Sequence, residues 1–113
     1  MNITFATKEL LKLANEPPMA NRKLGTKRVR LFHRRLQDMM AASCFEDLKY
    51  LPGNYHQLSA NRKDQWACDL DQPYRLVFMP GEDSIPKDLH GKQLLREIRI
   101  VEILEITNYH KEH

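Results

Sequence analysis

The segment HQLSANRKDQWACDLDQPYRLVFM (residues 56–79) decides the fold, because it holds most of three strand-like runs. The runs are residues 55–58, 65–70 and 74–79, and the turn-forming composition of Asp71-Gln72-Pro73 separates the last two. Apolar and polar residues alternate in both later runs, which predicts strands with one face toward a core. The predicted core-facing positions are Trp66, Cys68 and Leu70 on one strand and Tyr74, Leu76 and Phe78 on the next.

The same alternation turns Arg75, with Val77 and Met79, toward the opposite face of the sheet. We expect no helix layer there, so an arginine at that position is available to a ligand. Three short antiparallel strands can bring His56, Arg75 and the C-terminal Tyr109-His110 onto one sheet face.

Upstream of this segment the sequence predicts one short strand and two helices. Residues 3–5 are typical of a strand, and Thr7 is placed to cap a helix that contains Leu10, Leu11 and Leu13. Pro17-Pro18 interrupts that pattern. Leu24-Gly25-Thr26 is typical of a helix stop followed by a threonine N-cap, and the second helix should continue to about Ser43.

The second predicted helix has an apolar stripe and a basic side. The stripe recurs at spacings of three and four residues and comprises Val29, Phe32, Leu36, Met39 and Met40. Arg28, Arg34 and Arg35 should fall mostly on the other side, so this helix is expected to pack inward and present cations outward.

Downstream, residues 80–95 interrupt the sheet pattern with Pro, Gly and charged residues, and a helical turn is expected near 92–96. Residues 98–106 are rich in β-branched side chains and predict a long strand. Its polar positions Arg99, Glu102 and Glu105 repeat every three residues, which indicates a bulge or a change of edge. The prediction is therefore an α+β fold: an N-terminal strand and two helices packed on an antiparallel sheet of about four to five strands.

The composition of the chain limits its class. With 113 residues it is expected to form a single domain (1–113), and it contains no apolar run long enough for a membrane span. The N-terminus lacks the pattern of a secretory signal, so we expect a cytoplasmic protein in which Cys44 and Cys68 remain thiols. No CxxC pair is present and the five histidines are scattered, so no metal or other cofactor is expected.

Positive charge is concentrated in one part of the chain. The formal net charge is only +3, yet residues 17–37 contain no acidic residue. The basic residues of that window are Arg22, Lys23, Lys27, Arg28, Arg30, Arg34 and Arg35. A charge run is often just a solvated helix face, but the missing acidic counterweight favours a surface that binds a polyanion.

Several short motifs in this order resemble the HigB branch of the RelE superfamily of bacterial toxins. They are Leu24-Gly25, Arg35-Leu36, His56-x-Leu58, Asn61-Arg62, Trp66, Tyr74-Arg75-Leu76-x-Phe78 and Ile106-x-x-Tyr109-His110. The resemblance covers nearly the whole chain except residues 80–95. It implies a RelE-like toxin that enters the A site of the 70S ribosome and cuts the mRNA there. It also implies a HigA-type antitoxin with a helix-turn-helix fold as partner.

RNA cleavage by the 2′-hydroxyl requires a base, an acid for the departing 5′-oxygen, and cations at the phosphorus oxygens. His56 is the natural proton carrier, because an imidazole titrates near neutrality. Arg75 can contact two phosphate oxygens at once. Tyr109 can stack on a base or donate a hydrogen bond, and His110 can share the proton transfer, which leaves open which histidine is the base.

Each assignment has a structural alternative. His56 can be satisfied by a backbone partner, Arg75 can form a cross-strand ion pair with Glu102 or Glu105, and the C-terminal pair can simply anchor the terminus.

The chain departs from the family pattern at Ser59, where the resemblance leads one to expect a lysine three residues after the histidine. Arg62 or Lys63 could supply the missing charge from the following turn. If neither does, the loss of one stabilising donor costs about a hundred- to thousandfold in rate, so slow or context-restricted cleavage is expected. Two other classes remain open: a ParE-like toxin that binds DNA gyrase without nuclease chemistry, and a basic RNA-binding module without enzymatic activity.

Overall fold

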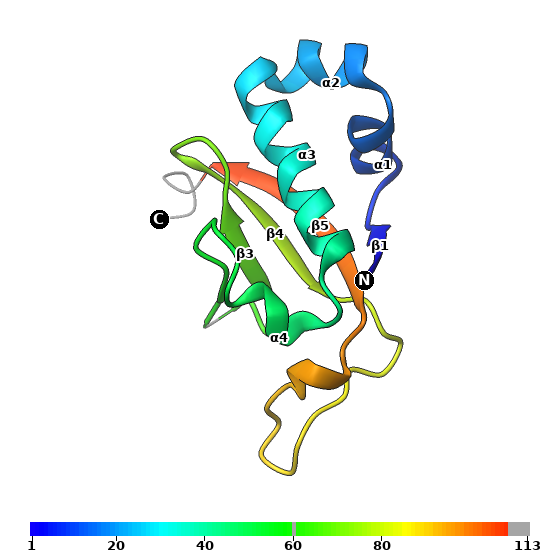
Figure 1. Cartoon of the computed structure of the whole chain (residues 1–113), viewed down its shortest axis with the longest axis vertical. Helices are drawn as coiled ribbons and strands as arrows, with labels where there is room; N and C mark the ends of the chain where they lie inside the picture. Colours follow the sequence, from blue (N-terminus) through cyan, green and yellow to red (C-terminus); the bar gives the residue numbers. More distant parts are fainter. Residues whose placement is uncertain (60, 109–113) are drawn as a thin grey trace.

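A five-stranded sheet with helices packed along it forms the body of the protein (Figure 1). The computed structural model describes residues 1–59 and 61–108. In chain order the elements are β1 (Asn2–Phe5), α1 (Lys8–Asn15), α2 (Pro17–Leu24), α3 (Thr26–Ala41), α4 (Phe45–Leu48), β2 (His56–Gln57), β3 (Trp66–Asp69), β4 (Tyr74–Pro80), the 3-10 turn η1 (Leu95–Glu97) and β5 (Ile100–Asn108). The predicted α+β class is confirmed.

The sheet is mixed rather than antiparallel, which corrects the prediction. The strand order is β1-β5-β4-β3-β2, and β1 pairs parallel to β5, with Ile3 opposite Val101. The other three pairings are antiparallel, as expected. A long helical connection leads away from β1, so no tight hairpin forces it into an antiparallel arrangement.

Four helices, α1 to α4, precede the hairpins, rather than the two expected. The Thr7 hydroxyl accepts a hydrogen bond from Leu10 N at 3.1 Å, which confirms the predicted cap. Pro17 ends the first helical pattern and also begins α2, because proline is well tolerated at the first helical position. Gly25, with φ of +83°, is the N-cap of α3, so Thr26 is the first residue of that helix and not its cap.

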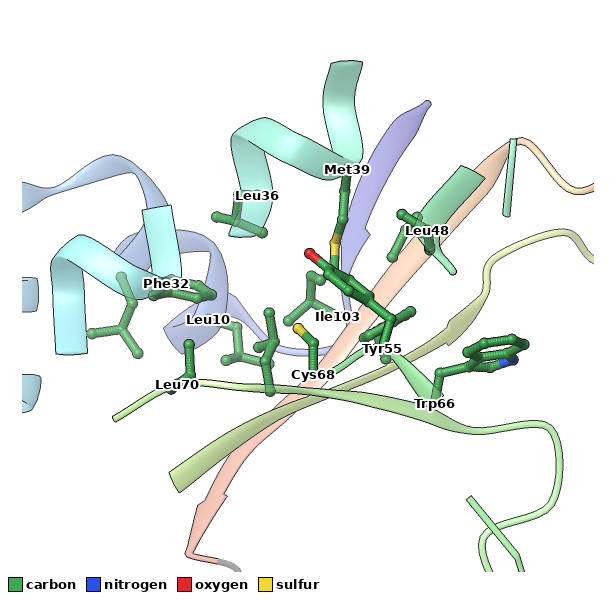
Figure 2. Close-up of a cluster of buried hydrophobic side chains, with 14 of the residues drawn as sticks. Leu10, Phe32, Leu36, Met39, Leu48, Tyr55, Trp66, Cys68, Leu70 and Ile103 are labelled. Atoms are coloured by element: carbon green, nitrogen blue, oxygen red, sulfur yellow. The ribbon is translucent and has the colours of Figure 1, made fainter. Parts of the chain in front are cut away.

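The apolar stripe of α3 faces the sheet. Val29, Phe32, Leu36 and Met39 are buried, as predicted. Leu36 and Met39 point from the helix toward sheet side chains such as Cys68 and Ile103 (Figure 2). Met40 is 62% exposed, so its assignment to the core was wrong. It follows Met39 by a rotation of about 100° round the helix and therefore falls outside the stripe.

A bulge interrupts β5 at Leu104. Phe78 on β4 lies opposite Ile103, yet its neighbour Val77 lies opposite Glu105, so one extra residue is accommodated on β5. This confirms the irregularity expected from the spacing of the polar residues. Because of the shift, Ile106 packs against the core beside Leu76, and Glu105 takes the opposite face.

Residues 81–99, called the arm below, project from the sheet between β4 and β5 (Figure 1). Polar contacts of Lys87 and Gln93 fasten the arm to the β2–β3 region. Lys87 forms an ion pair with Asp64 at 2.9 Å, and the indole N–H of Trp66 donates to Gln93 Oε1 at 2.8 Å. The helical turn expected near 92–96 is present as η1. Among the described residues, no helix has both the length and the apolarity that a membrane crossing requires.

A buried thiol and a buried phenol lie side by side in the core (Figure 2). Burial raises the pKa of the Cys68 thiol to about 12, and burial likewise raises the pKa of Tyr55. In both groups the folded state disfavours the ionised form, so their effect on stability is neutral below the ordinary pKa values and becomes unfavourable above them.

We therefore expect the free energy of unfolding, measured by urea titration, to change little between pH 7 and about 8.5 and to fall progressively toward pH 12 as these groups ionise preferentially in the unfolded chain. Cys68→Ala should make this alkaline decline shallower. A decline of equal steepness in that variant would assign the effect to other groups.

Candidate functional site

His56 and Arg75 lie on the same face of the sheet, the one opposite the helices. His56 pairs with Ala67 on β3, and Ala67 pairs with Val77 on β4. Ala67 and Val77 are fully buried but do not belong to the main core cluster, so this row lies on the second face. Arg75 is two residues from Val77 on β4, and it lies opposite Asp69 on β3 and Thr107 on β5. Directly opposed residues share a face, so the predicted placement of His56 with Arg75 is confirmed.

Both side chains line one depression of about 210 Å³. Its walls come from the end of β3, the β3–β4 turn and the segment that leads into β2. The lining residues are Asn54, His56, Asp69, Gln72, Pro73, Tyr74 and Arg75. Two other predicted site residues, Tyr109 and His110, lie outside the described residues.

The imidazole of His56 is held at one nitrogen. Its Nδ1 lies 2.7 Å from the carbonyl oxygen of Asn54. A carbonyl can only accept, so Nδ1 carries the proton in this hydrogen bond, and Nε2 of the neutral ring keeps a lone pair. His56 therefore has the backbone partner that was considered as an alternative, but only at Nδ1. The lone pair on Nε2 can still accept a proton.

Arg75 has a carboxylate as its neighbour across the hairpin. Asp69 is directly opposite Arg75 and lines the same depression. The alternative pairing expected for Arg75 was with Glu102 or Glu105. Glu105 Oε2 instead accepts a hydrogen bond from Arg62 Nη1 at 2.7 Å.

Asp69 and Tyr74 are site residues that the sequence reasoning missed. The sequence held a signal for Asp69. It lies as many residues before the Asp71-Gln72-Pro73 turn as Arg75 lies after that turn, and residues placed in this way pair across a hairpin. Tyr74 was taken only as a core residue, and it is half-buried at the rim of the depression.

Arg62 and Lys63 do not take the place of the missing lysine. Arg62 donates to Gln65 as well as to Glu105, and Lys63 is exposed on the β2–β3 connection. Within the part of the chain that the structure describes, neither residue lines the depression. Arg75 is the cation of the predicted set that does.

The prediction that Arg28 and Arg35 face outward is wrong. The guanidinium of Arg28 donates to both carboxylate oxygens of Asp71 at 2.9 and 3.1 Å and lies 3.4 Å from the ring centroid of Tyr74. Arg35 donates to the carbonyl oxygens of Asp69 and Pro52. Both side chains lie at the flank of the apolar stripe, where a long side chain reaches neighbouring loops more readily than solvent.

The outward-facing cations of α2 and α3 are a smaller set than expected. Lys23 is exposed and pairs with Glu9 at 3.1 Å, and we call the other four exposed cations, Arg22, Lys27, Arg30 and Arg34, the outer cationic face. On α3 the last three recur at spacings of three and four residues and therefore form one stripe. Arg34 is paired with Asp38 at 3.4 Å, a contact that is too exposed to hold it firmly.

No cluster of three or more His, Cys, Asp or Glu side chains suited to a metal ion occurs in residues 1–59 and 61–108. Comparison with known proteins assigns no family: no family model matches the chain, and no curated protein matches it.

Proposed function

We propose that this chain is a ribosome-dependent mRNA endoribonuclease, the toxin of a type II toxin–antitoxin pair. The single observation that supports it best is that His56 and Arg75, which are distant in sequence, line the same depression. The resemblance of the motifs to HigB toxins supports the same activity. In this proposal the substrate is mRNA in the A site of the 70S ribosome, and the partner is a helix-turn-helix antitoxin of the HigA type.

The proposed reaction is an attack of the ribose 2′-hydroxyl on the adjacent phosphodiester. His56 Nε2 takes the 2′-hydroxyl proton, since the hydrogen bond from Nδ1 to Asn54 fixes the required tautomer. The 2′-oxygen bonds to phosphorus and the bond from phosphorus to the 5′-oxygen breaks, leaving a 2′,3′-cyclic phosphate. The departing 5′-oxygen takes a proton from a second acid, a role for which His110 is the candidate from the sequence.

Arg75 supplies charge where the reaction needs it. Negative charge increases on the two non-bridging phosphate oxygens in the transition state, and a planar guanidinium can donate to both. Asp69 lies directly opposite Arg75 across the hairpin and lines the same depression. The outer cationic face contributes ribosome association through contacts with phosphate backbones, which carry no sequence information.

The experiment that tests this function is induction of the chain in a bacterium, followed by mapping of new RNA ends. We expect 5′-hydroxyl ends within translated messages, and their loss when translation is blocked before elongation. A His56→Ala chain, produced at the same level, is the control.

Three outcomes would contradict the proposal. DNA damage without new message ends would identify a gyrase-directed toxin, and binding to RNA without cleavage would identify a non-enzymatic module. New ends that persist in the His56→Ala chain would show that the cleavage does not depend on the proposed site.

A further inference from the structure

Two arginines of α3 hold the two loops that wall the depression. Arg28 and Arg35 are seven residues apart, close to two helical turns, and therefore extend from the same flank of the helix. Arg28 contacts the β3–β4 turn through Asp71 and Tyr74. Arg35 contacts the loop that precedes β2, which is the side of the depression that carries His56.

The loop of residues 52–54 is clasped between Arg35 and β3. Arg35 Nη1 donates to the Pro52 carbonyl at 3.2 Å, and Arg35 Nε donates to the Asp69 carbonyl at 2.8 Å. Asp69 N in turn donates to the Gly53 carbonyl at 2.8 Å. A Cβ atom on Gly53 would lie 2.8 Å from Arg35 Cζ, so the guanidinium packs directly on this glycine.

The same loop fixes the orientation of His56. Asn54 adopts a left-handed conformation with φ of +54°, and its carbonyl oxygen accepts the hydrogen bond from His56 Nδ1 at 2.7 Å. Left-handed backbone is unfavourable for most residues other than glycine and depends on support from its surroundings. Arg35 provides part of this support, two residues before Asn54.

We propose that Arg35 is a positioning residue for His56: by clasping residues 52–54 it aims the Asn54 carbonyl at Nδ1 and so keeps the lone pair of the imidazole on Nε2. This inference rests on the proposed function only for its consequence in catalysis. It also gives Arg35 a different role from the phosphate contact expected from its place in a basic window. The outer cationic face, on the solvent side of α2 and α3, keeps that contact.

The test is the ring tautomer of His56, measured by long-range ¹H–¹⁵N correlation in the folded, full-length chain. In the wild type we expect the Nδ1–H form alone. In Arg35→Ala we expect a mixture with the Nε2–H form, and kcat for cleavage of ribosome-bound message reduced by about a hundredfold, the usual penalty for a misplaced catalytic group. Ribosome affinity should change far less than kcat.

Two matched variants remove an arginine from α3 without touching residues 52–54. Arg34→Ala removes the charge next to Arg35. Arg28→Ala removes the contacts with Asp71 and Tyr74 at the β3–β4 turn, the other wall of the depression. Both variants should keep the Nδ1–H tautomer of His56. Arg35→Lys keeps the charge and can reach only one of the two carbonyls, so it should give a smaller change of tautomer. It also serves as the test if thermal unfolding shows that Arg35→Ala does not fold.

An unchanged tautomer in folded Arg35→Ala and Arg35→Lys would overturn the inference, whatever their activity. A mixed tautomer in Arg28→Ala of the same size would overturn it too, because the effect would then be a general loosening of the sheet. If the tautomer changes only in the Arg35 variants and the wild-type chain cuts no RNA, the link between Arg35 and His56 is supported and the proposed function is refuted.

Discussion

Substituting His56 with alanine is expected to lower the rate of cleavage of ribosome-bound mRNA by about a hundred- to ten-thousandfold, the range typical of a lost general base. The reason is that the proposed attack needs a proton acceptor beside the 2′-hydroxyl, and among the described residues that line the depression His56 offers an imidazole whose Nε2 keeps its lone pair. Single-turnover cleavage at saturating ribosome concentration measures this rate without a contribution from binding.

His90→Ala is the matched control for His56→Ala. It also removes an imidazole, but from an exposed position on the arm. Cleavage by this variant should equal that of the wild type. A wild-type rate in His56→Ala would remove His56 from the mechanism, and a loss in both variants would point to a fault of folding or production.

Replacing Arg75 with alanine is expected to reduce the rate of cleavage by about a hundred- to thousandfold while ribosome affinity falls far less. A guanidinium that donates to both non-bridging oxygens stabilises the transition state more than the bound message, so its loss is seen in kcat. Arg75→Lys should recover part of the rate, because a lysine retains the charge without the forked geometry.

The comparison for Arg75→Ala is the double variant Arg30→Ala, Arg34→Ala. It removes two charges from the outer cationic face, so it should weaken ribosome association and make association less dependent on salt. The rate at saturation should stay close to that of the wild type. Equal losses of affinity and rate in Arg75→Ala would contradict a transition-state role. Thermal unfolding of Arg75→Ala controls for the half-buried position of this residue in the sheet.

Local periodicity was enough to predict most elements of this fold. The alternation along β3 and β4 identified Trp66, Cys68 and Leu76 as core residues, and all three are buried. The parallel pairing of β1 with β5 could not be predicted, because no local pattern specifies which distant strand a short edge strand joins. Met40 was misplaced because apolar character at the margin of a helical stripe does not separate a buried methionine from an exposed one.

The part of the candidate site that lies on strands was predictable, because the two-residue period of a strand decides which face of the sheet a side chain takes. That period placed Arg75 with Val77, away from the core, and the hairpin then brought it to the depression that His56 lines. Arg28 and Arg35 were misjudged because a helical period gives the direction of a side chain and not what lies within its reach. The acceptors of Arg35 are backbone carbonyls of Asp69 and Pro52, which have no sequence signature.

Because of the bulge at Leu104, the two halves of β5 are held in register by different sets of neighbouring strands. The first half, through Ile103, is fixed by its pairing with both β1 and β4, and the second, from Glu105, pairs with β4 beside Arg75. A chain shortened by one residue at this point would keep both halves in phase with their neighbours, whereas a deletion elsewhere in β5 would invert one of them. Leu104 is thus the position at which this strand can change length during divergence without exchanging its inner and outer surfaces.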